Sequence, residues 1–288
     1  MNLYAYGIKS EIPLTVLDVE LAAFRLNPSP EFGGLGKAEH FWNIVAILWP
    51  EIGPDKKKNP CAFIRNPWAE KMAIEAAQRR TLAVLGGLNS NKTDFFAVWG
   101  LVNWVADAWN TMVLLTSTSL GDSRRRMWGS VKKYFQGSAI PMPGRLVDSL
   151  LTIATDDGTG RTDAKCGLTL IAGEKKKEKE AIGKLIGIKQ GTLLFICDEM
   201  PELSPALAEA FFSNLAPSNP KASMVAIGNF ASIYDALGSF CTPKQGWGSV
   251  CPDDAEWECE RGVYCIRFDG LKSPNLLLGE DKYPFLYS

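Results

Sequence analysis

Short apolar segments alternate with longer stretches of helical periodicity along most of the chain. The short segments, rich in Val, Leu and Ile, predict buried strands at residues 81–85, 112–116, 168–172, 193–197, 224–227 and 262–268. Apolar residues spaced three or four apart predict helices at residues 38–48, 67–79, 92–110, 122–135 and 204–215. Strands and helices that alternate in this way predict an α/β fold with a doubly wound, mainly parallel sheet flanked by helices.

The regular alternation does not extend to either end of the chain. Breakers such as Asn27-Pro28-Ser29-Pro30 interrupt the first sixty residues, so we expect an irregular N-terminal appendage over residues 1–60. The regular part begins with a helix that has Asn66 as its cap and Pro67 at its first position. Gly, Pro, Trp and Cys become frequent after Gly228. We therefore expect a core domain over residues 61–235 and a C-terminal extension over residues 236–288.

Composition and charge narrow the class of protein. With 46% hydrophobic and 22% charged residues, the 288-residue chain is typical of a globular protein. Its 31 Lys and Arg against 32 Asp and Glu exclude a strongly cationic nucleic-acid binder, so any such contact needs a local basic patch. No uncharged stretch reaches the roughly 18 to 20 residues of a membrane span, and no secretory signal is visible, so we expect no membrane partner. Seven cysteines, an odd number, indicate free thiols and a reducing compartment.

The strongest candidate for chemistry lies between the strand at 81–85 and the helix at 92–110. The segment follows the spacing G-x-x-x-x-G-K-[ST] of a phosphate-binding loop, and its residues are Gly86, Gly87, Leu88, Asn89, Ser90, Asn91, Lys92 and Thr93. In such loops backbone N–H groups hold phosphate oxygens, the Lys reaches the β- and γ-phosphates, and the hydroxyl binds Mg²⁺. Asn91 replaces the second Gly and keeps the loop possible, because Asn accepts left-handed backbone angles. An ordinary strand-to-helix turn is the alternative for this motif alone.

Two further strands end in polar side chains. The strand at 193–197 runs into Asp198 and Glu199, which predicts a metal-holding carboxylate and a general base at the ligand edge of the sheet. The strand at 224–227 runs into Gly228 and Asn229, and we expect Asn229 to sense the γ-phosphate, with a plain Gly-Asn turn as the alternative. A second glycine-rich segment, residues 32–37, ends in Lys37. It is rejected as a phosphate loop because its glycines are too closely spaced, Ala38 replaces the hydroxyl, and no strand precedes it.

These residues together resemble the large terminase subunit of tailed bacteriophages, specifically its ATPase part, over roughly residues 65–275. The resemblance rests on the loop at 86–93, the strand at 113–119 with Arg124-Arg125-Arg126 after it, the segment 196–202 and Ile227-Gly228-Asn229. It implies a RecA-like P-loop NTPase of the ASCE class, an ATPase that packages viral double-stranded DNA into a procapsid. The cofactors would be ATP and Mg²⁺, with Lys92 and Glu199 catalytic and Thr93 and Asp198 at the metal. The partners would be double-stranded DNA, the portal protein, the small terminase subunit and further copies in a ring. The location would be the cytoplasm of an infected bacterium, with transient docking on the procapsid.

The sequence departs from the family in two respects. Large terminases usually carry a C-terminal nuclease domain, and the residues after Gly228 are too few for one, so we expect the nuclease to be missing, as in a truncated chain. Some members also place an Arg inside the loop, where this chain has Leu88. We then expect a stimulating cation to come from elsewhere, namely from a neighbouring copy in a ring. The candidates are Arg124, Arg125, Arg126, Arg145, Arg161 and Lys189.

Contact with DNA and the function itself have open alternatives. Basic clusters at 124–133 and 175–184 predict contacts to backbone phosphates, although a solvated charged helix would look the same. A helicase-like DNA translocase would need a second RecA-like lobe, for which the chain is short. A nucleotide-gated assembly module that binds ATP with little turnover is the alternative from another class.

The remaining cysteines and the single histidine predict no further chemistry. Cys241, Cys251, Cys259 and Cys265 lack any C-x-x-C pair, which favours buried thiols over a structural zinc site. His40, the only His of the chain, lies in the expected appendage, so a His-based triad is excluded from the core.

Overall fold

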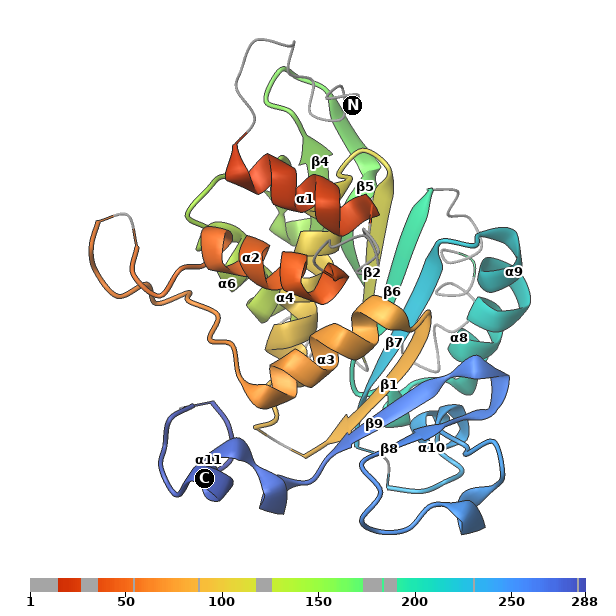
Figure 1. Cartoon of the computed structure of the whole chain (residues 1–288). Coiled ribbons are helices and arrows are strands. Elements are labelled where there is room, and N and C mark those ends of the chain that lie inside the picture. Colours follow the sequence, from red (N-terminus) through yellow and green to blue (C-terminus); the bar gives the residue numbers. More distant parts are fainter. Residues whose placement is uncertain are drawn as a thin grey trace.

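A single sheet runs through the centre of the protein in the computed structural model, with helices on both of its faces (Figure 1). The structure describes residues 15–26, 36–53, 55–87, 89–117, 126–172, 183, 191–229, 231–283 and 285–288. Within them the sheet has nine strands in the order β3-β4-β5-β2-β6-β7-β1-β9-β8. The strands are β1 (Thr81–Gly86), β2 (Thr111–Ser117), β3 (Gly144–Val147), β4 (Thr152–Asp156), β5 (Thr162–Ala172), β6 (Thr192–Cys197), β7 (Ala222–Gly228), β8 (Glu256–Glu258) and β9 (Tyr264–Phe268).

The six central strands, from β5 to β9 in this order, are all parallel to one another. They include every strand expected from the apolar segments, and the doubly wound α/β fold is confirmed. The β3-β4 pair at one end of the sheet and β8 at the other are antiparallel additions. These three strands have three to five residues each, and no residue of β3 or β8 is fully buried. They therefore lack the continuous apolar pattern that marks a strand buried on both faces.

Five helices of the described chain cover one face of the sheet: α1 (Val16–Leu26), α2 (Lys37–Leu48), α3 (Pro67–Gln78), α4 (Lys92–Ala106) and α6 (Met127–Gln136). Helix α4 lies directly on the sheet and is buried nearly all round. Trp99 of α4 meets Phe24 of α1 at 5.6 Å and Phe41 of α2 at 4.9 Å between ring centroids, so both helices are held on α4 by aromatic contacts.

Shorter helices cover the opposite face. They are α8 (Pro205–Ala210), which continues through a π-helical turn at Phe211–Leu215 into α9 (Ala216–Ser218), and α10 (Ala236–Phe240). Leu193, Phe195 and Cys197 of β6 point into this second core, whereas Leu194 and Ile196 point into the first. The alternation explains why the β6 sequence is apolar throughout, since each of its faces is buried. A last helix, α11 (Pro274–Leu278), lies near the C-terminus.

The two ends of the chain contribute to the same fold as its middle. Strand β9 pairs in parallel with β1, and helices α1 and α2 share the core of α4. Helix α1 lies in the N-terminal region that we expected to be irregular, so this expectation is wrong for residues 16–26. The apolar pattern of α1 is weak, because only Leu17, Leu21 and Phe24 of its eleven residues are buried, and helix-breaking residues follow it in the sequence. The boundaries at residues 61 and 236 remain a prediction.

The cysteines are free, and Cys241, Cys259 and Cys265 are buried together between α10 and β9. The expectation of a buried thiol is wrong for Cys251, which is exposed in the loop before β8. Burial raises the pKa of the Cys265 thiol well above its ordinary value, which favours the uncharged form. No group of three or more metal-binding side chains occurs within the described ranges. None of the helices in the described part of the chain is both long and apolar enough to span a membrane.

The expected cap of α3 is confirmed and supplies a test of the fold. The Asn66 side-chain oxygen accepts a hydrogen bond from the Ala69 backbone N–H at 3.0 Å. We predict that Asn66→Ala lowers the free energy of unfolding by about 1 kcal/mol, because the oxygen that satisfies this N–H is lost. The shift in the midpoint of urea unfolding measures the change. Asn66→Asp is the control, since it keeps an acceptor oxygen, and an equal loss in both variants would contradict the capping role.

Candidate functional site

The carboxyl ends of three parallel strands meet at one edge of the sheet. Leu85 of β1 pairs with Gly228 of β7, and Cys197 of β6 pairs with Ala226 of β7. The chain segments that follow these strands therefore emerge side by side and surround a cavity of about 530 Å³. Of the residues expected at the site, the cavity is lined by Gly86, Gly87, Asn89, Ser90, Asn91, Lys92, Thr93, Asp198, Glu199 and Asn229. Leu88 lies outside the described residues.

The loop between β1 and α4 has the backbone geometry expected from its sequence. Asn91 has φ 59° and ψ 15°, the left-handed conformation predicted for it, and it stands just before the first residue of α4. Asn89 is also left-handed, with φ 58°. Gly86 is closely packed, because a Cβ atom there would lie only 3.2 Å from Ser90 Oγ and 3.3 Å from Phe268 Cβ. The loop therefore folds back tightly at the start of α4.

Lys92 is curled over this loop. Its Nζ donates hydrogen bonds to the Gly86 carbonyl oxygen, to the Gly87 carbonyl oxygen at 3.0 Å and to Ser90 Oγ at 2.6 Å. Burial lowers the pKa of Lys92 to about 8, although the nearby carboxylates of Asp198 and Glu199 favour its charged form. Among the described residues, the amine is thus hydrogen-bonded to neutral oxygens, and a phosphate would bind it more strongly.

Asp198 has a carboxylate oxygen that nothing in the described structure satisfies. The residue is 3% exposed, its Oδ1 accepts the Glu199 backbone N–H at 3.1 Å, and its Oδ2 has no hydrogen-bond partner within the described ranges. Burial, together with the charge of Glu199, raises the pKa of Asp198 to about 7. Oxygen ligands suit Mg²⁺, and a buried carboxylate oxygen without a donor fits such an ion, with the Thr93 hydroxyl lining the same cavity.

Glu199 forms an ion pair that the sequence did not predict. Its backbone is left-handed, with φ 50°, and its Oε1 accepts a hydrogen bond from Arg126 Nη1 at 2.5 Å. Arg126 immediately precedes α6 and lines the cavity. In the sequence, Arg126 was one of several candidates for a cation that acts on a neighbouring copy. Its pairing with Glu199 of the same chain was not predicted, because a run of three Arg residues does not indicate which carboxylate each of them contacts.

Helix α6 is attached to the start of α4, which explains how Arg126 comes to lie at the cavity. Asp94 of α4 accepts hydrogen bonds from Ser130 Oγ and, at 3.2 Å, from the Tyr134 hydroxyl. Burial, with the charge of Asp94, raises the pKa of Tyr134, so the hydroxyl stays protonated and keeps donating. Ser130 and Asp94 also line the cavity, and neither was expected there.

The C-terminal segment supplies one more unexpected wall. Phe285 lines the cavity, and the Tyr287 backbone N–H donates to the Asn89 carbonyl oxygen at 3.2 Å. The segment is anchored by the buried Asn275, whose side chain bonds Tyr283 through both its oxygen and its nitrogen. The contact between Tyr287 and Asn89 joins residues almost two hundred positions apart, so no local pattern in the sequence predicts it.

The basic clusters expected to contact DNA are only partly described. In α6, Lys132 pairs with Asp148 at 3.0 Å and Lys133 lies 3.8 Å from Asp94, so both have acidic neighbours. Arg124, Arg125, Lys189 and the lysines of 175–184 lie outside the described residues. Contact with DNA through these clusters remains a prediction.

Comparison with known proteins identifies the fold. The ATPase domain of the large terminase from Thermus phage P74-26 is 11% identical, with a TM-score of 0.52 over 78% of this chain and 95% of that one. A point variant of that domain gives 0.51 at 11% identity, over 73% and 83% of the two chains. This chain has the fold of a phage large terminase ATPase domain. The resemblance expected from the motifs is thereby confirmed at the level of the fold.

Other comparisons are looser. The large terminase of another thermophilic bacteriophage, solved in complex with ADP, is 15% identical, with a TM-score of 0.47 over 75% of this chain and 46% of that one. A scan against protein-family models finds no match, and a search of curated protein sequences finds none.

The raised pKa of Asp198 predicts how stability depends on pH. The carboxyl ionises near pH 4 in the unfolded chain but near pH 7 in the folded one, so the folded state loses stability as pH rises from about 4 to 7. We predict that Asp198→Asn, without metal or nucleotide, stabilises the fold by roughly 1–3 kcal/mol above pH 7 and much less near pH 4.

Calorimetric melting temperatures of both chains between pH 4 and 8 measure this gain. Addition of Mg²⁺ should raise the melting temperature of the unaltered chain and leave that of Asp198→Asn unchanged. A gain that is the same at every pH would show that Asp198 is ionised throughout.

Proposed function

We propose that this chain is an ATP-hydrolysing domain that drives the packaging of double-stranded DNA into a procapsid. The observation that supports the proposal most is the convergence of Lys92, Asp198 and Glu199 around one cavity at the carboxyl edge of a parallel sheet. The fold shared with terminase ATPase domains agrees with it. ATP, with its phosphates toward the loop, is the substrate that this arrangement suits.

The loop and its lysine bind the phosphates. Backbone N–H groups of the loop and of the first turn of α4 face the oxygens, aided by the positive end of the helix dipole. Lys92 leaves Gly87 and Ser90 and binds the β- and γ-phosphates, whose charge restores its pKa toward the ordinary value. Asn229, beyond the end of β7, contacts the γ-phosphate and links its presence to the shape of the sheet edge.

Glu199 is the general base. Its carboxylate takes a proton from the water whose oxygen attacks the γ-phosphorus, the bond to the bridging oxygen breaks, and ADP leaves. Asp198 and the Thr93 hydroxyl hold Mg²⁺, which when bound neutralises charge on the phosphate oxygens. Phe285 adds an apolar side chain to the wall of the same cavity.

Assembly follows from the same proposal. Copies of the chain form a ring on the portal protein of the procapsid, with the small terminase subunit presenting the DNA, in the cytoplasm of the infected bacterium. Basic side chains contact DNA through its backbone phosphates, because a packaging motor must move every sequence equally.

The roles of Lys92 and Glu199 predict that their substitution affects different steps, ATP binding for Lys92 and hydrolysis for Glu199. Lys92→Ala should abolish ATP binding, since the charge that holds the phosphates is gone. Glu199→Gln should retain binding and lower steady-state phosphate release at least about 100-fold, because the amide cannot accept the proton. Calorimetric titration with a non-hydrolysable ATP analogue and a phosphate-release assay separate the two. Retained hydrolysis in Glu199→Gln would overturn the mechanism.

A second candidate function is a nucleotide-gated assembly module that binds ATP with little turnover. The ion pair between Arg126 and Glu199 is the observation that favours it, because the guanidinium hydrogen-bonds the Glu199 Oε1 atom, which would otherwise be open to accept a proton from the attacking water. In the motor, by contrast, Arg126 transfers to the γ-phosphate when ATP arrives and stabilises charge there, as an arginine finger does.

Arg126→Ala distinguishes these two roles. For the motor we predict a loss of turnover of about tenfold or more with ATP binding retained, because the γ-phosphate loses a positive partner. An increase in turnover would instead show that Arg126 restrains Glu199 and would favour the gated module. Phosphate release by the chain alone, with and without DNA, measures the effect. Lys244→Ala is the control, since Lys244 is exposed, lies outside the cavity and pairs only with Glu258 within the described residues.

A further inference from the structure

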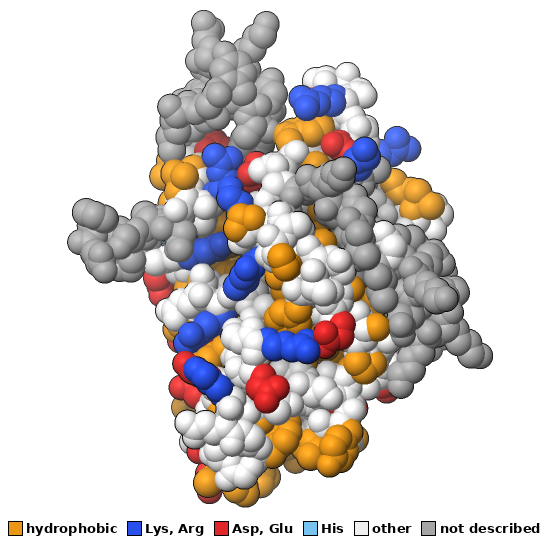
Figure 2. Space-filling view, turned by 90° about the vertical axis from the view of Figure 1, so that its right-hand side faces the viewer, with side chains coloured by type: hydrophobic (Ala, Val, Ile, Leu, Met, Phe, Trp, Pro, Cys, Tyr) orange, Lys and Arg blue, Asp and Glu red, His pale blue; other side chains and the backbone are white. Residues whose placement is uncertain are grey.

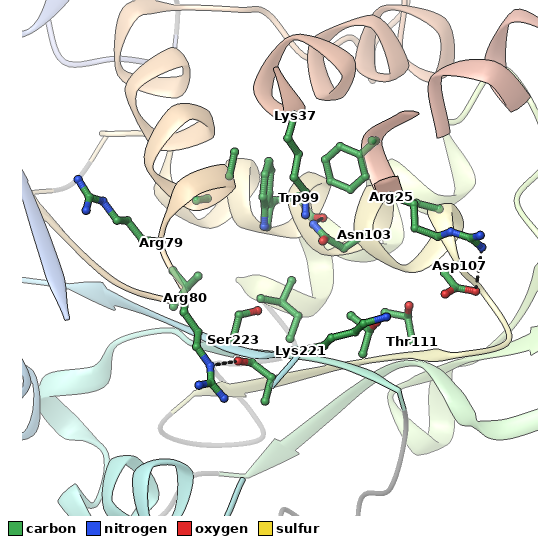
Figure 3. Close-up of a pocket in the computed structure, with 18 of the residues that line it drawn as sticks. Arg25, Lys37, Arg79, Arg80, Trp99, Asn103, Asp107, Thr111, Lys221 and Ser223 are labelled. Carbon is green, nitrogen blue, oxygen red and sulfur yellow. Dashed lines mark hydrogen bonds and ion pairs between the residues drawn. The ribbon is translucent and has the colours of Figure 1, made fainter. Parts of the chain in front are cut away.

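A second cavity lies at the opposite edge of the sheet, where β1, β2, β6 and β7 begin (Figure 3). Its volume is about 760 Å³, within the range of roughly 300–1,000 Å³ that is usual for small-ligand sites. The ends of α1 and α3, the start of α2 and the last turns of α4 form its other walls. It shares no lining residue with the cavity around Lys92.

The charge around this cavity is strongly positive. Its lining includes five cationic side chains, Arg25, Lys37, Arg79, Arg80 and Lys221, and one carboxylate, Asp107. The whole chain has a formal net charge of −1, so this local excess is not a property of the average surface. Figure 2, which views the molecule from the side where these strands begin, shows Lys and Arg side chains spread along that face. Such a concentration of positive charge around a concave site attracts and holds anions.

Three of the five cations are already engaged. Arg79 pairs with Glu75 at 3.1 Å, and Figure 3 shows it turned away from the other labelled side chains. Arg80 donates to backbone carbonyl oxygens, among them that of Ala222 at 2.8 Å. Arg25 lies 3.6 Å from Asp107. These side chains support the walls, and they leave Lys37 and Lys221 as the two ammonium groups without a carboxylate partner among the described residues.

Lys37 is placed as a ligand-binding lysine would be. It is half-buried, points from the start of α2 into the cavity, and has its Nζ 4.6 Å from the centre of the Phe24 ring (Figure 3). Burial lowers its pKa. A half-buried ammonium group with no carboxylate partner among the described residues is less stable than one in water, so a bound anion would stabilise its charged form.

Two further features of the cavity wall suit an anion. The cap of the twelve-residue α2 is Gly36, which makes no side-chain cap, so the positive end of the helix dipole lies beside Lys37. Thr111, 1% exposed and in the wall where β2 begins, has a hydroxyl without a hydrogen-bond partner within the described ranges. Asn103 and Ser223 add neutral polar groups.

We propose that this cavity binds a small phosphate-bearing anion between Lys37 and Lys221, at a site separate from the phosphate loop. A multiply charged phosphate matches two ammonium groups on opposite walls better than a single carboxylate does. A DNA duplex is too wide to enter a cavity of this volume, which favours a small molecule. The proposal does not depend on ATP turnover.

Tripolyphosphate is the probe, used with the full chain in calorimetric titration. Because the loop also binds such anions, the Lys92→Ala chain serves as the reference, and we expect it to retain one site. Lys37→Met in that background should weaken binding at least tenfold, and Lys221→Ala, at an exposed position that leaves folding intact, should weaken it severalfold. Lys244→Ala should leave it unchanged.

Two results would overturn the proposal. The first is a Lys92→Ala chain that binds no tripolyphosphate, or binds it equally well after both lysine substitutions. The second is a loss of affinity for a short DNA duplex in Lys37→Met without any change for tripolyphosphate, which would assign the basic surface to DNA. The urea midpoint of Lys37→Met confirms that any loss is not a loss of fold.

Discussion

Parallel pairing of β1, β6 and β7 is the constraint on which the candidate site depends. The three strands are hydrogen-bonded in register, so their carboxyl ends cannot shift relative to one another without breaking the ladder. The polar segments after them are therefore presented together, although Lys92 and Asp198 are more than a hundred residues apart. The apolar cores on the two faces hold the pairing, since each face of β6 is buried against helices. The chemistry at the edge is thus supported by the most buried part of the molecule.

Electrostatics at that edge are unfavourable without a ligand. Lys92 has its pKa lowered and Asp198 has its pKa raised, both mainly by burial, so each charged form is less stable there than in water. Neither group has a strong partner of opposite charge in direct contact, because Lys92 bonds to neutral oxygens and one oxygen of Asp198 bonds to nothing described. A phosphate and a divalent cation would satisfy both at once. Glu199 and Arg126, which are more exposed, already satisfy each other.

The features that could be predicted from the sequence are those that depend on residues close together in the chain. Buried parallel strands require continuous apolar runs, a cap requires a residue such as Asn66, and a left-handed position favours Asn91, so each could be read from neighbouring residues. The pairing of Arg126 with Glu199 and the arrival of Phe285 at the cavity depend on the tertiary fold, and nothing near them in the sequence encodes the partner. The edge strands were missed for a different reason: they are short and partly solvated, so their pattern is weak. Helix α1 is stabilised chiefly by its contacts with other helices, which a single sequence does not display.

Asn91 has a consequence for how such loops are recognised. A left-handed residue other than Gly is strained slightly, and it persists here because β1 and α4 hold the two ends of the loop in place. Strand β1 and helix α4, more than the residue type at position 91, therefore determine the path of the backbone in this loop. A search pattern that requires Gly at this position therefore passes over the segment, although its backbone angles and its place between strand and helix agree with those expected of a phosphate loop. The residue type at this position can thus differ from the consensus while the backbone keeps the left-handed turn that the consensus Gly would provide.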